Sequence, residues 1–561
     1  MKGNMKIKRQ SNTPEPSFLE EDDRCIRRIF FCLSAVYILL LIPVLLIGRY
    51  DVPSADDFSM GLGTRLTYEA TGSVLAVPGK VLSETVRYYR TWIGYFTSCL
   101  FTTVSPATFG EKWYALTPGI ILLVLHIGVI VFFYALMEKA LGISRWVRRC
   151  MTVLTLFLMI QLMPEGSLRV EAFYWWSGAG NYTLTFAVGL LYLAFLLLAA
   201  YADGRRARNA FFVLACVFGF FAGGGNYLSS LSWAIVTVLL GAALLLIRSG
   251  KMGALLWKKE DGPAEAEDSS GRELWNRHLC FRGDLSLRLL VPMGFLLAGF
   301  AVSCLAPGNR IRGGEAQGFG AVKSILLSLY YTLSYPLNQW MNWAVLLVLA
   351  ITAVIFWMGF EADRETDGVL SRLTFAFPFR AAVLGYGIVS AVVTPALYAQ
   401  GNMAAGRIQS TFWLHTVLVL VLLEWYLVGG LYRAWHKRAG ICEEHGNEGK
   451  ANCRRAICLI RGLAFFLLVF SLLAVKADPD FYTASSAASE LLGGSAVQYG
   501  RENTDRFALL HDPEEEDAVL PRHTVHPQLL YFADVSEDPD DWANRKMSEY
   551  YGKKSIRGAG Q

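Results

Sequence analysis

Charged residues are scarce in this chain of 561 residues: Asp, Glu, Lys and Arg together make up 18%, whereas hydrophobic residues make up 54%. A composition this poor in charge argues against a soluble protein, although the length alone would suggest several soluble domains. The ten cysteines have no regular spacing, and none follows residue 476. The sequence therefore predicts no disulfide framework.

Two further absences narrow the class of protein. No small-residue cleavage pattern follows the first apolar run, Ile29–Ile47, so this run is predicted to be a membrane anchor rather than a removable signal peptide. The net charge of +5 comes mostly from basic residues in alternate loops. It is therefore mainly a signal of membrane topology, and binding to nucleic acid has no support.

Long apolar runs dominate the rest of the sequence, and such runs are typical of helices that span a bilayer. We predict an all-α integral membrane protein with about 11 transmembrane helices. The predicted spans are Ile29–Ile47, Trp113–Met137, Met151–Met163, Tyr182–Tyr201, Ala210–Phe221, Leu228–Ile247, Leu289–Leu305, Trp343–Phe360, Ala381–Leu397, Phe412–Leu431 and Leu459–Val475. An amphipathic run, Ala321–Leu337, either lies in the membrane interface or adds a twelfth span.

Basic residues define the predicted orientation. Arg24, Arg27 and Arg28 precede the first span, and alternate loops after it carry further Lys and Arg, whereas the short loops between them carry few. By the positive-inside rule, the N-terminus and the basic loops are cytoplasmic. Eleven spans then place the C-terminal region on the outer side of the membrane.

This topology divides the chain into three parts. Residues 1–28 form a cytoplasmic tail, residues 29–476 a multi-pass transmembrane domain, and residues 477–561 an extracytoplasmic region, which is either a small domain or packed against the helices. The first outer loop, residues 49–112, is long. Within it, Lys80–Leu100 has apolar and aromatic residues at three- and four-residue steps, which predicts one or two helices on the outer membrane surface, with a packed subdomain as the alternative.

An acidic pair, Asp56 and Asp57, opens the first outer loop shortly after the first span. A carboxylate at this depth can act as a general base where a lipid head group meets an aqueous cleft. Adjacent carboxylates point in different directions in most backbones, so one can do chemistry while the other orients a partner or binds a divalent cation. The alternative is a solvated loop or a helix cap.

Arginines are sparse in the short outer loops, so each of them needs a partner. Arg310 and Arg312 follow Asn309 in one Gly-rich outer loop, and Arg407 lies in another. Guanidinium groups bind phosphate through paired donors, and nearby glycines allow backbone amides to approach an anion. These residues are candidate ligands of a lipid-carrier phosphate, with lipid phosphates or structural ion pairs as the alternative.

The second outer loop holds candidates for contacts to a sugar or an acceptor. Trp175 and Trp176 can stack on a sugar ring, although an aromatic belt at the membrane interface is the commoner use of such residues. Asn181 can bond a hydroxyl group or merely cap a helix. The remaining candidates for this role are Arg169, Glu171 and, in the first outer loop, Trp92.

The order of these motifs resembles the glycosyltransferase C superfamily, and more closely an uncharacterised bacterial family of multi-pass proteins within or near it. The matching segments are Ala55-Asp56-Asp57-Phe58, Trp92-Ile93-Gly94-Tyr95-Phe96, Glu171 to Asn181, Ala306-Pro307-Gly308-Asn309-Arg310, Gly406-Arg407, Trp542-Ala543-Asn544 and Tyr550-Tyr551-Gly552. The resemblance implies an inverting transfer of a sugar from a polyprenyl-phosphate carrier on the outer face. An outer-loop aspartate would be the base, and arginines would hold the carrier phosphate.

The leading hypothesis is therefore a membrane glycosyltransferase that acts on a cell-envelope glycan or lipid acceptor. No cofactor is certain, and a divalent cation, Mg²⁺ or Mn²⁺, is left open. The expected partners are the lipid bilayer, the polyprenyl-phosphate-linked sugar and the acceptor. The alternatives are a transporter or flippase of lipid-linked glycans, which would depend on polar groups within the spans such as Glu424, and a non-enzymatic envelope-assembly protein.

Overall fold

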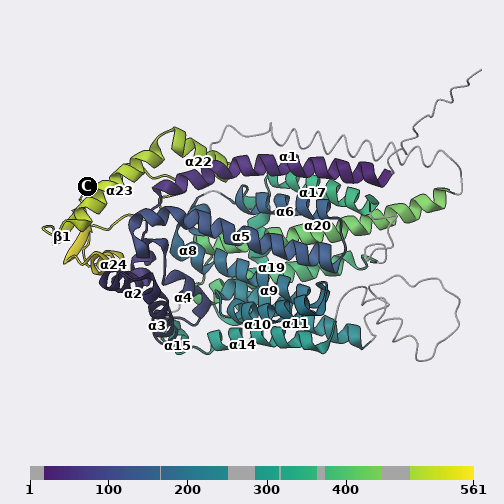
Figure 1. Ribbon diagram of the computed structural model, residues 1–561, viewed down its shortest axis with the longest axis horizontal. Coiled ribbons are helices and arrows are strands. Elements are labelled where there is room, and N and C mark those ends of the chain that lie inside the picture. Colours follow the sequence, from purple (N-terminus) through teal and green to yellow (C-terminus); the bar gives the residue numbers. More distant parts are fainter. Residues whose placement is uncertain are drawn as a thin grey trace, which may run out of the picture.

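The computed structural model describes residues 18–164, 166–249, 285–314, 318–362, 373–443 and 480–560. Its long helices run side by side in one bundle, and a smaller C-terminal part covers one end of the bundle (Figure 1). Within the described ranges, nine helical segments are long and apolar enough to cross a membrane. The prediction of a multi-pass α-helical membrane protein is confirmed.

The helices of the bundle vary in length. They are α1 (Phe18–Ile47), α5 (Thr117–Phe133), α6 (Arg145–Ile160), α9 (Thr183–Tyr201), α10 (Arg205–Gly223), α11 (Tyr227–Arg248), α14 (Leu290–Cys304), α16 (Ala321–Tyr335), α17 (Trp343–Ala362), α19 (Pro378–Gln400) and α20 (Gly406–Glu443). Nine of the predicted apolar runs coincide with the nine segments that can cross a membrane.

The other predicted runs have different outcomes. Met151–Met163 falls largely on α6, which has 16 residues and is shorter than a typical spanning helix. The amphipathic run Ala321–Leu337 forms α16, a helix of 15 residues. The last predicted span, Leu459–Val475, lies outside the described residues. The described part of the chain thus supports nine spans of the predicted 11.

Helix α9 is the central helix of the bundle. In the segment that contains it, 89% of the most apolar stretch is buried, whereas in the segment that contains α1 only 11% is buried. Small residues let neighbouring helices approach α9 closely, as at Gly128 of α5, where a Cβ would lie 3.2 Å from the Ala187 carbonyl oxygen. The outer helices leave their apolar residues exposed because lipid, rather than water, surrounds a membrane protein.

The first loop forms α2 (Asp56–Thr71), α3 (Val77–Thr91) and α4 (Phe96–Thr102) at one end of the bundle (Figure 1). The predicted helical stretch Lys80–Leu100 is thus two helices separated by a bend. The expectation that both lie on a surface differs from the structure, because Thr97, Ser98 and Cys99 of α4 are buried among the other helices. The bend at Gly94 directs α4 inward.

The C-terminal region covers the same end of the bundle (Figure 1). It consists of α22 (Thr483–Leu492), α23 (Ser495–His511), β1 (Asp517–Leu520), α24 (Trp542–Tyr551) and β2 (Ser555–Gly558). The two strands pair in parallel, with Asp517 opposite Ser555. Phe58 of α2 packs edge-on against Tyr550 of α24, with 5.3 Å between the ring centroids, so this region shares a core with the first loop.

Candidate active site

The acidic pair occupies the first two positions of α2. A helix N-terminus favours negative charge because its first backbone N–H groups have no partner within the helix. The residue before the pair, Ala55, has φ 48° and ψ −115°, a conformation that is costly for any residue with a Cβ. Such strain persists only where the surroundings enforce it.

Asp57 is buried and fully hydrogen-bonded. Its Oδ1 accepts from the backbone N–H of Ser177 at 2.9 Å and from the Ser177 hydroxyl group. Its Oδ2 accepts from the Tyr114 hydroxyl group at 2.5 Å and from the backbone N–H of Ser54 at 3.2 Å. Burial raises the pKa of Asp57 to about 6, and these hydrogen bonds oppose the rise. With every acceptor site used by the protein, Asp57 holds α2 in place.

Asp56 has different surroundings. It is half-buried, and its carboxylate has no hydrogen bond or ion pair with any residue that the structure describes. Burial raises the pKa of Asp56, and the positive charges of Arg407 and Arg312 oppose this rise. Asp56 is therefore a carboxylate that is partly withdrawn from water, lies near two cations and has its acceptor sites available.

A large cavity opens between the first loop and the ends of several bundle helices. Its volume is about 1040 Å³. Its polar side carries Asn226, Asn309, Arg312 and several tyrosines, whereas Leu231, Phe300, Ile325, Pro395 and other apolar residues of α11, α14, α16 and α19 form the rest. The cavity thus joins a polar mouth to an apolar interior among membrane helices.

Two arginines lie near the polar side of this cavity. The Arg312 guanidinium donates to the Tyr95 hydroxyl group at 3.3 Å and lies 4.9 Å from the centroid of the Trp92 ring. Arg407, the second residue of α20, forms an ion pair with Glu171 at 3.0 Å. The charge of Arg407 acts on the pKa of Arg312, so the guanidinium groups are near neighbours. Arg312 has no ion pair among the described residues, so its charge can bind an additional anion.

Glu171 and Arg169 are predicted site residues with different surroundings. Glu171 accepts from the backbone N–H groups of Gly406 and Arg407 at 3.0 and 3.1 Å, which caps the N-terminus of α20 and fixes Arg407 beside the cavity. Arg169 is buried and donates to the backbone carbonyls of Met163, Asp480 and Phe481. It therefore ties the C-terminal region to the bundle, away from the cavity.

The predicted tryptophans also differ in their surroundings, because two are buried and one is exposed at the cavity. Trp175 is buried, stacks on Phe532 and donates its Nε1–H to the Ser54 carbonyl at 3.0 Å. Trp176 is also buried, and its Nε1–H donates to the Phe101 carbonyl at 2.9 Å. Trp92 is 44% exposed at the cavity, so its ring is the more accessible surface for a sugar.

Two of the remaining predicted polar residues, Asn309 and Asn181, are hydrogen-bonded within the protein. The Asn309 Oδ1 accepts from the Gly94 N–H at 2.9 Å and from the Tyr227 hydroxyl group at 3.0 Å. The Asn181 Oδ1 accepts from the Asn226 amide at 3.1 Å. Arg310 is exposed and has no partner among the residues that the structure describes. Of these residues, only Arg310 is free to bind an anion without losing a bond.

Sequence analysis missed several residues of the site. Tyr114 and Phe532 lie outside the motifs of the sequence, and Ser177 lies within the segment from Glu171 to Asn181 but was not singled out. Ser177 is 120 positions and Tyr114 57 positions from Asp57. No local pattern indicated that these side chains would meet the acidic pair or its neighbours.

The structure thus defines a multi-pass membrane protein with an acidic pair near two arginines, one of which, Arg312, lines a cavity that reaches among the helices. No family model matches the chain, and no curated protein matches it. Among solved structures, the chain is similar to a crystal structure of ArnT from Cupriavidus metallidurans bound to undecaprenyl phosphate, at 13% identity over 94% of this chain and 86% of that one. The TM-score of 0.38 is too low for this likeness to carry an argument about fold or function.

Proposed function

We propose that this protein is an inverting membrane glycosyltransferase whose donor is a sugar on a polyprenyl phosphate and whose acceptor is a hydroxyl group of the cell envelope. Asp56 takes the proton of the acceptor hydroxyl group while the oxygen of that hydroxyl group attacks the anomeric carbon. The bond from that carbon to the phosphate oxygen breaks, and polyprenyl phosphate leaves with the electron pair. Attack opposite the leaving group inverts the anomeric carbon.

One observation carries this proposal: the carboxylate of Asp56, which has no hydrogen bond or ion pair among the described residues, experiences the charges of Arg312 and Arg407, and Arg312 lines a cavity with an apolar interior. A general base needs available acceptor sites, and Asp56 has them whereas Asp57 does not. A leaving phosphate needs cations that are already in place, because charge develops on it in the transition state. An apolar cavity among membrane helices suits a prenyl chain.

The other predicted residues have supporting roles in this proposal. Arg310, Arg312 and Arg407 bind the phosphate, and Asn309 shapes the loop that carries two of these arginines. Trp92 offers a ring to the sugar, and Glu171 positions Arg407. Asp57 is a positioning residue that fixes the direction of α2.

The role of a divalent cation is open. Mg²⁺ is commonly held by one or two carboxylates together with substrate phosphates, and Asp56 is the carboxylate that would hold it here. No group of three His, Cys, Asp or Glu side chains that could hold a metal ion occurs within the described ranges of the chain. Loss of transfer after treatment with EDTA, with recovery on adding Mg²⁺ or Mn²⁺, would establish dependence on the metal.

The experiment is a transfer assay with the purified protein in lipid and a panel of polyprenyl-phosphate-linked sugars. We expect Asp56→Asn to lower transfer by about 100-fold or more, because the amide cannot accept the proton. Asp540→Asn is the matched control, since Asp540 is an exposed aspartate of the C-terminal region. Transfer by Asp56→Asn at the wild-type rate would contradict the proposal.

The same assay distinguishes the transferase hypothesis from the transporter hypothesis. Glu424 lies in α20, and one of its carboxylate oxygens is buried without a hydrogen-bond partner. A carrier would bind a lipid-linked glycan without turnover, and Glu424→Gln would impair movement of that glycan across vesicles. Turnover that is lost in Asp56→Asn and kept in Glu424→Gln supports the transferase.

A further inference from the structure

An aromatic stack joins the C-terminal region to the neighbourhood of the turn at residues 54–57, which contains the acidic pair. The ring of Phe532 lies on the ring of Trp175, with 3.9 Å between the centroids and 13° between the planes. The Arg407 guanidinium is also near Trp175, 5.5 Å from its centroid. Trp175 is 3% exposed, so its position is determined by these neighbours. Phe532 therefore contacts a residue that lies beside Arg407 of the candidate site.

Trp175, held by Phe532, restrains the backbone beside Asp56 through a hydrogen bond. Its Nε1–H donates to the Ser54 carbonyl at 3.0 Å, and the Ser54 N–H donates to the Asp57 carboxylate. Ser54 is thus held from both sides, immediately before the strained Ala55. Without such restraints, the backbone at Ala55 would relax toward a negative φ and turn the first residue of α2.

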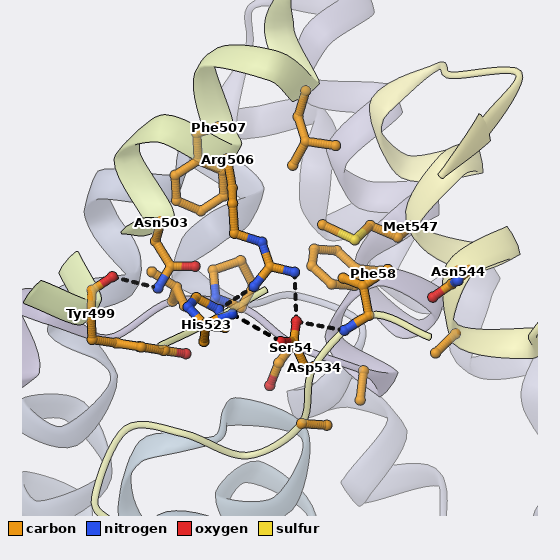
Figure 2. Close-up of a pocket in the computed structure, with 17 residues that line it drawn as sticks. Ser54, Phe58, Tyr499, Asn503, Arg506, Phe507, His523, Asp534, Asn544 and Met547 are labelled. Atoms are coloured by element: carbon orange, nitrogen blue, oxygen red, sulfur yellow. Dashed lines mark hydrogen bonds and ion pairs between the residues drawn. The ribbon is translucent and has the colours of Figure 1, made fainter. Parts of the chain in front are cut away.

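Space beside this turn allows such a relaxation. A cavity of about 60 Å³ is lined by Ser54, Ala55 and Phe58 and by residues of the C-terminal region such as Arg506 and Met547. Figure 2 shows the side chains around it. Across the cavity, Arg506 is bonded to His523 and Asp534 rather than to the turn (Figure 2). The restraint on the turn therefore comes from the side of Trp175 and Asp57.

We propose that Phe532 is a positioning residue for sugar transfer, which acts through Trp175 and Ser54 to aim the carboxylate of Asp56. This inference rests on the proposed function. It makes the C-terminal region a part of the active site, because a side chain that follows all the bundle helices in the sequence determines the geometry of the base. A misplacement of a reacting group by about 1 Å can cost about 100-fold in rate.

The test compares two substitutions that each remove one aromatic stack. We expect Phe532→Leu to lower kcat by about 10- to 100-fold with little change in the donor KM, because the ion pair with Glu171 still holds Arg407. Phe532→Tyr, which keeps the ring, should retain most of the activity. Phe481→Leu is the matched control. Phe481 belongs to the same region, and its ring stacks on that of Trp343 outside the site, with 5.8 Å between the centroids.

A double variant separates positioning from general stability. Glycine adopts a positive φ at little cost, so Ala55→Gly should let the turn keep its conformation without the full restraint. We expect Ala55→Gly to restore a substantial part of the kcat that Phe532→Leu loses. Ala55→Gly also relieves strain in the whole fold, so the same substitution is made in Phe481→Leu, where a positioning role of Phe532 predicts no gain in kcat.

The outcomes are distinguishable from failure of the proposed function. No transfer by the wild-type protein with any donor would overturn both proposals. Wild-type transfer with an unchanged kcat in Phe532→Leu would overturn the positioning role alone. Equal losses in Phe532→Leu and Phe481→Leu, without rescue by Ala55→Gly, would also overturn it, because both losses would then reflect stability.

Discussion

At the scale of single residues, two adjacent carboxylates differ because one is saturated with donors and the other is not. Asp57 accepts from Ser54, Ser177 and Tyr114, whereas Asp56 faces Arg312 and Arg407 without a bond among the described residues. The first arrangement stabilises a conformation, and the second leaves a group able to accept a proton. Two predictions follow from this difference.

Asp57→Ala should lower the free energy of unfolding by about 3–5 kcal/mol, because it leaves buried donors of three residues without an acceptor. Asp56→Ala should change the free energy by about 0.5 kcal/mol or less, since no hydrogen bond is lost. Thermal unfolding of both variants in detergent measures the difference. Equal melting temperatures for the two variants would show that the bonds of Asp57 contribute little.

The pH dependence of kcat should identify the base. Asp56 must be ionised to accept a proton, so the rate rises with pH through its pKa, and burial places that pKa above 3.8. Arg312→Gln removes a charge that lowers the pKa of Asp56, so we expect the midpoint to move to higher pH at saturating donor. Asp57, whose pKa is about 6, also titrates, but no arginine is among the causes of its pKa shift. An unmoved midpoint in Arg312→Gln would point away from Asp56.

At the scale of elements, close backbone packing joins the first loop to the bundle. A Cβ at Gly94 would lie 1.9 Å from the Ser303 carbonyl oxygen at the end of α14. A Cβ at Gly308 would lie 2.6 Å from the backbone nitrogen of Trp92. These glycines let α15 (Pro307–Gly313), which carries Arg310 and Arg312, approach the bend between α3 and α4. The position of these arginines thus depends on the absence of side chains.

Gly94→Ala should therefore destabilise the protein by about 3 kcal/mol through overpacking and should also raise the donor KM. Gly79→Ala is the control, because nothing lies within 4 Å of a Cβ at Gly79 in α3. Alanine there should stabilise the helix by about 0.5–1 kcal/mol. Thermal unfolding and donor titration measure both effects, and a Gly94→Ala variant with wild-type values would contradict the close packing.

At the scale of the whole molecule, the first loop and the C-terminal region lie at one end of the bundle, opposite the start of α1 (Figure 1). The candidate site lies at this end, so the proposed reaction would take place on the side of the membrane where both segments lie. The basic turn at Arg205, Arg206 and Arg208 lies at the start of α10, one crossing away from Asn226 at the cavity.

An epitope tag inserted after Pro513 should be reached by an antibody on right-side-out vesicles, because this exposed turn belongs to the C-terminal region. A tag inserted after Asp203, next to the basic turn, should be reached only after the vesicles are opened. Labelling of intact and opened vesicles measures the accessibility of both tags. The reverse pattern would place the candidate site in the cytoplasm.

Much of the architecture could be predicted from the sequence because membrane helices are specified locally. Apolar runs of sufficient length must satisfy their own backbone hydrogen bonds in lipid, and nine predicted runs form such helices. The acidic pair and the arginines were found because charge is rare in such a chain. Their role as a base and as phosphate ligands stays a prediction.

The sequence by itself determined that the chain crosses the membrane many times and that Asp56, Asp57, Arg312 and Arg407 are candidate site residues. Only the tertiary structure decided which carboxylate is saturated and which is free, because the donors to Asp57 come from distant segments. It also decided that the ring of Trp175 packs on Phe532 of the C-terminal region. Burial and hydrogen bonding depend on residues that meet only after folding, and no local pattern records them.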